Sequence, residues 1–357
     1  MKKLRYQVVG VMSGTSLDGI DLACIQFVDF KGVWEFKITA AETHAYPEVW
    51  KRKLENASLL SIPEITDLDE TYTIYLAEVI QQFLKEHQLT EDTLDAVCAH
   101  GHTVLHQPEN GITIQIGNNS ALAKKIGLKT VCDFRVQDVK LGGQGAPLVP
   151  IGDRLLFAEY TYCLNLGGFA NVSLEKDEKR IAYDIGAVNT VLNFLAEQMG
   201  YGFDEDGKIA ALGEVDDNLL ASLNALSFYQ QQAPKSLGIE WVKAKVFPLI
   251  KAAPISIKNK IATYTYHAAQ QIAHELKGNA TQQVLITGGG AFNSTLIKHI
   301  KSLCSLQLVI PEKELVEYKE ALVFGLLGVL KLTGKVNVLK SVTGASKDHS
   351  SGKIFLP

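Results

Sequence analysis

A glycine-rich polar turn near the start of the chain is the first place where residue types and spacing suggest chemistry. Apolar runs at 5–11 and 20–28 predict two strands, and residues 13–19 between them read Ser-Gly-Thr-Ser-Leu-Asp-Gly. Glycine allows backbone N–H groups to approach an anion closely, and the hydroxyls add hydrogen-bond donors. The carboxylates of Asp18 and Asp21 have the oxygen chemistry that holds a metal ion through water. Because no Gly-Lys-Ser/Thr follows, the turn is not a P-loop, and a polar hairpin without a ligand is the alternative.

The same arrangement returns in the second half of the chain. Residues 160–166 and 172–175 predict strands, and the turn over 165–171 reads Asn-Leu-Gly-Gly-Phe-Ala-Asn. Two strand–turn–strand units about 150 residues apart suggest that two domains begin with the same motif and hold a polyphosphate between their turns. A third glycine run at 288–290 joins a predicted strand to a predicted helix, an arrangement typical of close approach to a nucleotide.

Several polar side chains lie at the ends of predicted strands. Asp184 ends one strand shortly before Gly186, a position suited to accepting a proton from a bound hydroxyl or water, with a helix cap as the alternative. His100, His102 and His106 follow another strand. Their spacing on a loop has no standard metal geometry, so hydrogen bonding to a polar ligand or within the loop is favoured over a metal.

The order of the predicted elements indicates the fold class. Strands alternate with helices through the first half, including a helix at 63–87 with an aromatic stripe, and this pattern indicates an α/β domain. Ligands of open α/β sheets gather at the carboxyl ends of strands. Asp133 and Arg135 follow the predicted strand at 129–132 and are therefore candidate ligand-binding residues.

Length and composition limit the function classes. A chain of 357 residues predicts two domains, here 1–135 with the tail 337–357 packing back on it, and 136–336. A net charge of −4 gives no reason to expect a nucleic acid or an anionic membrane as partner. Five scattered cysteines without a CxxC pair argue against zinc and a disulfide framework, which suits the cytoplasm. No apolar run reaches transmembrane length.

Eight motifs together resemble one enzyme family. In chain order they read GTSLDGID, HGHTVLHQP, DFR, GGQGAPLVP, NLGGFANVS, APKSLG, GGGAFN and VTGAS. The chain is identified by them as similar to the anhydro-N-acetylmuramic acid kinases, which belong with the actin, hexokinase and heat-shock chaperone ATPases. The resemblance implies a two-domain actin-like fold of duplicated, ribonuclease H-like mixed sheets around an interdomain cleft.

The resemblance also implies an activity. Members use ATP and Mg²⁺ to open 1,6-anhydro-N-acetylmuramic acid with water and to phosphorylate the freed 6-hydroxyl during peptidoglycan recycling. Asp184 matches the carboxylate that activates water, and Arg135 would face the lactyl carboxylate of the sugar. The implied partners are an amino sugar and ATP, with no nucleic acid and no membrane, and a homodimer is left open.

Further site residues are implied by the matching motifs. Nucleotide binding falls on Gly14, Thr15, Ser16, Leu17, Asp18, Gly19, Ile20, Asp21, Asn165, Gly167, Gly168, Asn171, Gly288, Gly289, Gly290 and Asn293. Substrate binding falls on His102, Asp133, Arg135, Gly143, Gly145 and Glu320. The candidate metal ligand is Asp18, acting through water.

The chain departs from the family pattern at three places. Residues 184–189 read Asp-Ile-Gly-Ala-Val-Asn where Asp-Thr-Gly-Pro-Gly-Asn is usual, His102 replaces a Gln, and Glu205 stands where Arg is common. A kinase of a related amino or anhydro sugar is therefore the alternative enzyme. An ATP-binding sensor or chaperone is the alternative outside catalysis, although no substrate-binding appendage domain is visible.

Overall fold

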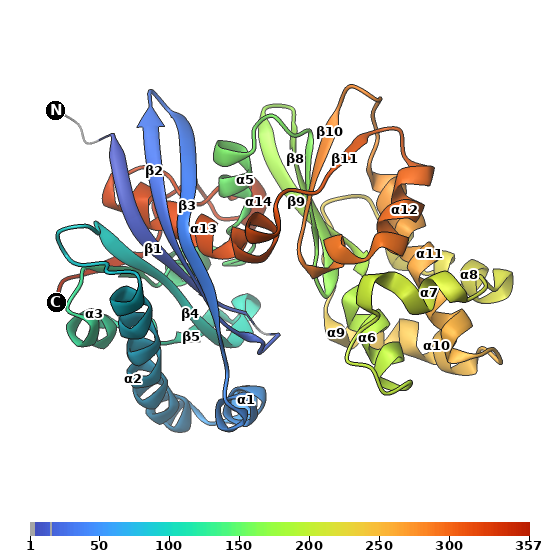
Figure 1. The fold of residues 1–357 in the computed structure, drawn as a ribbon, viewed down its shortest axis with the longest axis horizontal. Helices are drawn as coiled ribbons and strands as arrows, with labels where there is room; N and C mark the ends of the chain where they lie inside the picture. Colours follow the sequence, from blue (N-terminus) through green and yellow to red (C-terminus); the bar gives the residue numbers. More distant parts are fainter. Residues whose placement is uncertain (1–3, 15) are drawn as a thin grey trace. The chain divides into compact units, whose positions relative to one another are not determined.

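The computed structural model describes residues 4–14 and 16–357, and the chain forms two units (Figure 1). Unit 1 comprises Met1–Leu156 and Tyr318–Pro357, and unit 2 comprises Phe157–Glu317. Each unit has its own mixed β-sheet with helices packed against it. The expected α/β class is therefore confirmed. No helix in the described part of the chain is long and apolar enough to cross a membrane.

The sheet of unit 1 has seven strands in the order β12-β6-β4-β1-β2-β3, with β5 paired to β4. β1, β2 and β3 form an antiparallel meander, whereas β4 is parallel to β1 and β6 is parallel to β4. The strands are β1 (Arg5–Ser13), β2 (Gly19–Phe30), β3 (Val33–Ala45), β4 (Ala96–Gln107), β5 (Ile112–Ile116), β6 (Thr130–Cys132) and β12 (Lys353–Phe355).

Helices cover both faces of this sheet (Figure 1). The α-helices of unit 1 are α1 (Glu48–Glu55), α2 (Ile62–Glu86), α3 (Ser120–Ile126), α4 (Val136–Lys140), α5 (Pro150–Leu156), α14 (Lys340–Thr343) and α13 (Lys313–Leu332) from Tyr318 onward. Side chains alternate along a strand, so Val9 and Val11 pack with α2 while Val8 and Gly10 face α13. A methyl group at Gly10 would overlap the Ala321 carbonyl, so α13 lies directly on the strand backbone.

Helix α2 (Ile62–Glu86) has the periodic burial that the spacing of its apolar residues predicts. Its buried side chains recur every three or four residues and face β1, β2 and β4. Ser61 and Glu64 form a capping box at its start, because the backbone N–H of Ser61 donates to the Glu64 carboxylate at 2.7 Å. The prediction of a helix at 63–87 is confirmed within one residue.

The sheet of unit 2 repeats the strand pattern of the first. Its order is β11-β10-β7-β8-β9, with β7, β8 and β9 antiparallel, β10 parallel to β7 and β11 parallel to β10. The strands are β7 (Tyr162–Leu166), β8 (Phe169–Lys176), β9 (Lys179–Ala187), β10 (Gln283–Thr287) and β11 (Gln307–Val309). Each sheet therefore has a three-stranded meander extended by parallel strands beside its first strand, and the predicted duplication is confirmed.

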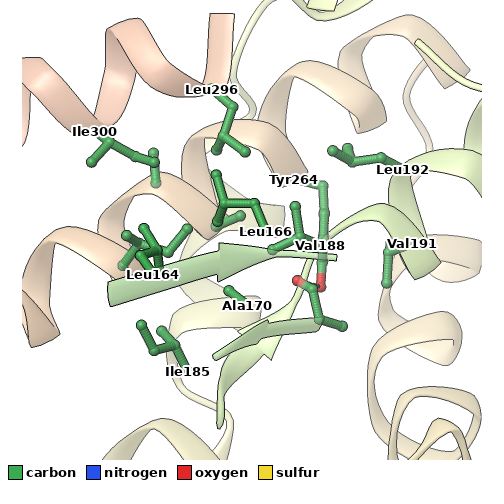
Figure 2. Close-up of a cluster of buried hydrophobic side chains, with 14 of the residues drawn as sticks. Leu164, Leu166, Ala170, Ile185, Val188, Val191, Leu192, Tyr264, Leu296 and Ile300 are labelled. Carbon is green, nitrogen blue, oxygen red and sulfur yellow. Dashed lines mark hydrogen bonds between the residues drawn. The ribbon is translucent and has the colours of Figure 1, made fainter. Parts of the chain in front are cut away.

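The core of unit 2 lies between this sheet and a layer of helices. Figure 2 shows Leu164, Ala170 and Ile185 on the strands, with Leu296 and Ile300 facing them from α12. The α-helices of unit 2 are α6 (Asn189–Glu197), α7 (Lys208–Leu212), α8 (Asp217–Asn224), α9 (Ile239–Trp241), α10 (Phe247–Ala252), α11 (Ile257–Glu275) and α12 (Ser294–Leu303), with a π-helical turn at Val242–Val246.

The unit boundaries differ from the expected ones. Residues 136–156 and 318–336, expected in the second domain, belong to unit 1. The reason is the close packing of α13 on the first sheet, where Gly328 fits against Cys98 of β4. α5 follows α13 into unit 1, because the Asp153 carboxylate pairs with Lys319 at 2.7 Å in a buried ion pair. The tail 337–357 adds β12 to the edge of the same sheet.

Candidate active site

Asp184 lies on β9 beside a β-bulge. In the β8–β9 ladder Ala170 pairs with Gly186 and Asn171 pairs with Asp184, which leaves Ile185 as an extra residue. Bulges redirect neighbouring side chains and are common next to active sites. Ile185 is 1% exposed and packs in the core drawn in Figure 2, so the backbone next to Asp184 is held firmly.

The Asp184 carboxylate is hydrogen-bonded on one side only. Its Oδ2 accepts hydrogen bonds from the Leu237 N–H at 2.9 Å and from the Ser236 hydroxyl at 3.2 Å. Within residues 4–14 and 16–357 no group donates to Oδ1. Burial raises the pKa of the Asp184 carboxyl, and the hydrogen bonds from Leu237 and Ser236 act in the opposite direction. The result is an oriented carboxylate with one oxygen left for a proton, the arrangement of a general base.

Arg135 of unit 1 is oriented by two hydrogen bonds. Its Nε donates to His100 Nε2 at 2.8 Å, and its Nη1 donates to the Gly145 carbonyl at 2.7 Å. His100 Nδ1 donates to the Gly101 carbonyl at 2.8 Å, which leaves Nε2 as the acceptor. Burial and the nearby guanidinium keep the pKa of His100 well below its usual range, so its ring is neutral. Arg135 Nη2 donates to no group in the described residues, because the two hydrogen bonds of the side chain are made by Nε and Nη1.

Gly101 explains how the histidines reach their positions. The prediction placed His100–His106 on a loop after a strand, but the residues lie inside β4. The β1–β4 register shifts there, from Val11 opposite Ala99 to Ser13 opposite His102. Gly101 has φ of 77°, and a Cβ would lie 2.5 Å from the Ile116 carbonyl, so only glycine suits this irregular strand.

Asp138 organises the glycine-rich connection that carries Gly143 and Gly145. The Asp138 side chain is fully buried, and its Oδ2 accepts from the Gly145 N–H at 2.7 Å. Its Oδ1 accepts from the Thr343 hydroxyl at 2.8 Å. Gly143 lies so close to the Asp138 carboxylate that a Cβ would overlap it. Asp138 thus sets the path of the loop whose Gly145 carbonyl orients Arg135.

His102 lies in a different network from Arg135. It is 2% exposed, and its Nδ1 is 2.8 Å from the Ser13 hydroxyl. Ser13 is 2.6 Å from the Tyr46 hydroxyl, which is 2.6 Å from the Tyr72 hydroxyl. Burial lowers the pKa of His102 to about 4, so the imidazole is neutral. His102 therefore contacts Ser13, the last residue of β1, at the point where the first glycine-rich turn begins.

Asp133 and Glu320 have contrasting surroundings. The Asp133 carboxylate pairs with Lys353 of β12 at 2.7 Å and holds the tail against the sheet. Glu320 is exposed as a residue, but the protein around its carboxyl group displaces part of the solvent and raises its pKa. The nearby Arg135 guanidinium acts to lower that pKa. Glu320 in turn helps to keep Arg135 protonated, since burial lowers the Arg135 pKa only to about 10. Of the two carboxylates, Glu320 is the one that shares the electrostatic environment of Arg135.

The first glycine-rich turn combines exposed and structural residues. Ser16 and Asp18 are exposed, and a Cβ at Gly14 would meet nothing closer than Ser16 Oγ at 3.4 Å. Gly19 instead packs on the His44 backbone of β3, where a Cβ would lie 2.6 Å from the carbonyl oxygen. Ile20 and Leu17 contribute their side chains to the core or its margin. Thr15 lies outside the described residues.

The second turn and the glycine run lie side by side in unit 2. Asn165 and Asn171 pair across β7 and β8, next to Gly167 and Gly168. A Cβ at Gly288 would lie 2.6 Å from Asn165 Oδ1. The two elements thus meet at the carboxyl ends of β7 and β10.

The other residues of the glycine run have mixed roles. A Cβ at Gly290 would lie 2.8 Å from that of Leu166, whereas Gly289 has nothing within 4 Å. Asn293 caps α12, because its Oδ1 accepts from the Leu296 N–H at 2.9 Å. Gly289 is accordingly the member of this run whose lack of a side chain no protein contact explains.

Comparisons with known proteins find one family that matches nearly the whole chain. Residues 6–357 match the family described as anhydro-N-acetylmuramic acid kinase. The chain is 34% identical to the anhydro-N-acetylmuramic acid kinase of Mannheimia succiniciproducens, over 99% of each chain. It is 32% identical to that of Pasteurella multocida, over 99% of this chain and 98% of the relative. This chain belongs to the anhydro-N-acetylmuramic acid kinase family.

One solved structure shows a weaker likeness. The activator of the 2-hydroxyisocaproyl-CoA dehydratase from Clostridium difficile, solved with bound ADPNP, aligns over 90% of this chain and 94% of that chain. The sequence identity is 13% and the TM-score is 0.44, too low to support an argument. Family membership rests on the sequence comparisons, and it confirms the expectation of a kinase.

The residues of the first turn fit the metal that kinases of this family are expected to use. Mg²⁺ keeps several waters and is bound through one or two carboxylates together with substrate phosphates. Asp18 is exposed, and Asp21 has one oxygen engaged by the Thr43 hydroxyl at 2.6 Å. The described residues contain no group of three histidines, cysteines or acids that could hold a metal. The donor set fits a metal held through water and phosphate rather than a protein cage.

Gly14 offers a clean test of the first turn in this family. Replacing Gly14 by Val should weaken ATP binding about tenfold or more, because the side chain would keep phosphate oxygens from the backbone N–H groups. The fold should persist, since the position is open. Gly202→Val is the control, because a Cβ at Gly202 would likewise be unobstructed, with nothing within 4 Å. Titration calorimetry measures the affinity, and an unchanged value for Gly14→Val would remove this turn from the nucleotide site.

Gly168 is a less selective test than Gly14. A Cβ at Gly168 would lie 2.8 Å from the Thr190 hydroxyl, so a substitution would also disturb the start of α6. The two turns therefore differ in how far protein packing already requires glycine.

Sequence reasoning did not predict the contacts that build these sites. His100 was expected to bond a polar ligand or its own loop, whereas it accepts a hydrogen bond from Arg135. Asp138, which orients the loop at Gly145, and Ser236 and Leu237, which hold Asp184, were given no role. The APKSLG motif, at residues 233–238, belongs to the family pattern, but its residue types alone indicate no role. The position of this motif in the sequence does not indicate that it contacts Asp184 on β9, because that contact is made only in the tertiary structure.

Proposed function

We propose that this chain uses ATP to phosphorylate 1,6-anhydro-N-acetylmuramic acid, with water opening the anhydro bridge, in the recycling of peptidoglycan. Family membership supports the reaction class. The observation that carries the proposal is the Asp184 carboxylate, with Oδ2 engaged by Leu237 and Ser236 and Oδ1 left for a proton. ATP supply places this reaction in the cytoplasm.

Asp184 acts first on water in the proposed reaction. Oδ1 takes a proton from the water, whose oxygen bonds to carbon 1 of the sugar while the bond from carbon 1 to the bridging oxygen breaks. Asp184 then gives this proton to the departing bridging oxygen, which becomes the 6-hydroxyl, and the carboxylate is ionised again. A raised pKa suits this role, because it makes the Asp184 carboxylate a stronger base than an ordinary aspartate.

The freed 6-hydroxyl then receives the γ-phosphoryl group. Its oxygen bonds to the phosphorus, ADP leaves, and the hydroxyl proton passes to Asp184 or to solvent. Phosphoryl transfer depends chiefly on positioning and charge stabilisation. Mg²⁺, when bound near Asp18, would neutralise phosphate charge. Arg135 would bind the lactyl carboxylate through Nη2 and the remaining N–H of Nη1.

A substrate panel tests this proposal. ADP formation and product mass are measured with 1,6-anhydro-N-acetylmuramic acid, with the same sugar without the bridge, and with 1,6-anhydro-N-acetylglucosamine, which lacks the lactyl group. We expect the first to react best and to gain one water and one phosphoryl group. Preference for the second would favour a plain amino-sugar kinase, and preference for the third would favour a different anhydro sugar. ADP formation without a sugar product would contradict a sugar kinase.

A further inference from the structure

The loop at residues 233–238, which donates two hydrogen bonds to Asp184, is itself anchored by a buried charge. Lys235 immediately precedes Ser236, and its side chain is 3% exposed. Its Nζ lies 3.1 Å from Glu275 Oε1 at the end of α11 and 5.0 Å from the centre of the Phe228 ring. Burying an ammonium group is costly unless it is paired, and here a carboxylate and an aromatic face both compensate it.

Glu275 ties together the two segments that meet at Asp184. Its second oxygen, Oε2, accepts from the Tyr183 hydroxyl at 3.0 Å, and Tyr183 directly precedes Asp184 on β9. Its first oxygen holds Lys235 of the loop. The loop and the strand also meet directly, because the Asp184 N–H donates to the Lys235 carbonyl at 2.9 Å. One carboxylate on α11 therefore braces both the strand of Asp184 and the loop that donates to Asp184.

This geometry is sensitive to small movements. The Leu237 N–H and the Ser236 hydroxyl lie within two residues of Lys235 and reach the same carboxylate oxygen. Hydrogen bonds weaken steeply as distance and angle deteriorate, so a shift of the Lys235 backbone would loosen both donors. Displacements of about 1 Å at a catalytic group can cost about a hundredfold in rate.

We propose that Lys235 and Glu275 form a positioning pair for Asp184, which acts by holding the Ser236 and Leu237 donors on Oδ2 so that Oδ1 faces the reacting water. The pair touches no reacting atom in this scheme. Its role as an aid to catalysis rests on the proposed function, whereas its effect on Asp184 does not depend on the substrate.

The test compares Lys235→Met and Glu275→Gln with the parent protein. Lys235→Met keeps the length of the side chain over Phe228 and removes its charge. Glu275→Gln keeps the shape and removes the opposite charge. Lys208→Met is the control, since Lys208 forms an exposed ion pair with Glu205 at 2.9 Å. Thermal unfolding shows whether each variant is folded.

The first readout is the pKa of the Asp184 carboxyl, followed by ¹³C NMR of Asp-labelled protein and assigned by the signal lost in Asp184→Asn. Hydrogen bonds to the ionised form lower a carboxyl pKa, so losing them should raise it. We expect an upward shift of about one unit in Lys235→Met and Glu275→Gln and none in Lys208→Met. An unshifted Asp184 pKa in either folded pair variant would overturn the proposal.

The second readout is kinetic and separates this proposal from the function itself. In Lys235→Met we expect kcat to fall about 10- to 100-fold with the ATP KM nearly unchanged, and the acid side of the pH profile to move to higher pH. Lys235→Arg should restore most of the rate. If Asp184→Asn stays active, the assignment of the base fails; if Asp184→Asn is inactive but the pair variants keep the parental pH profile, only the positioning role fails.

Discussion

Asp184→Asn should abolish both ring opening and phosphorylation while ATP and the sugar still bind. The amide oxygen of Asn can occupy the place of Oδ2 and accept from Leu237 and Ser236, so the local structure should be retained. The amide nitrogen would then replace Oδ1 and could not take a proton. A positioned base contributes roughly 10²–10⁴-fold, so we expect turnover to fall by that factor. Sugar products are measured by mass and ADP by a coupled assay.

The pH profile of the parent protein checks the same assignment. A carboxylate acts as a base only when it is ionised, so activity should fall as the pH drops through the pKa of Asp184, which burial places above the usual range.

The control for Asp184→Asn should be another aspartate whose loss leaves the fold intact. Asp204→Asn is not suitable, because Asp204 accepts hydrogen bonds from two backbone N–H groups in a buried turn. Asp177→Asn on the exposed β8–β9 turn is a better one. Near-normal turnover of Asp184→Asn, or ring opening without phosphorylation, would show that Asp184 is not the shared base.

Much of the fold was readable because local patterns agreed with tertiary packing. The helix α2 and the strand before the glycine run at 288–290 were both predicted, and they are observed at Ile62–Glu86 and Gln283–Thr287. The strand containing the histidines was predicted too short. Its polar residues break the apolar pattern, yet backbone pairing with β1 and β5 continues through them with the help of the Gly101 irregularity.

The domain boundary could not be read from local sequence. α13 is apolar on most sides, and nothing in such a pattern says which sheet it covers. Its assignment to unit 1 depends on small residues, Gly325 and Gly328, that let it lie close to β-strand side chains. The eight motifs indicated the family without knowledge of the tertiary structure, because each motif is local.

What the motifs did not supply are the partners that orient each functional group. His100 lies 35 residues before Arg135 in the chain, and Ser236 lies 52 residues after Asp184. Such pairs are brought together only by sheet topology and by loops that return across it. His102, expected to bind substrate because of its place in the family motif, lies within hydrogen-bond distance of the Ser13 hydroxyl, a contact that the motif does not indicate.

Arg135→Lys should raise the sugar KM far more than the ATP KM. The guanidinium of Arg135 donates from Nε to His100 and from Nη1 to the Gly145 carbonyl. These two hydrogen bonds fix the plane in which its remaining N–H groups lie. A lysine ammonium cannot reach both partners and still present two parallel donors to a carboxylate. Hydrogen bonds to charged groups contribute about 1.5–3 kcal/mol, so the sugar KM should rise about 10- to 100-fold.

Two companion measurements decide what Arg135 does. Arg154→Lys tests whether any arginine of unit 1 has this effect, and it should leave the sugar KM within about twofold, below the change expected from one lost charged hydrogen bond. A sugar analogue without the lactyl carboxylate should bind the parent and Arg135→Lys almost equally, because the interaction at issue is absent from both complexes. Equal rises in the sugar KM and the ATP KM would instead assign Arg135 to phosphate binding or to support of the loop at Gly145. A loss of thermal stability without a change in either KM would assign it to folding, since removing the guanidinium leaves His100 Nε2 and the Gly145 carbonyl without their donor.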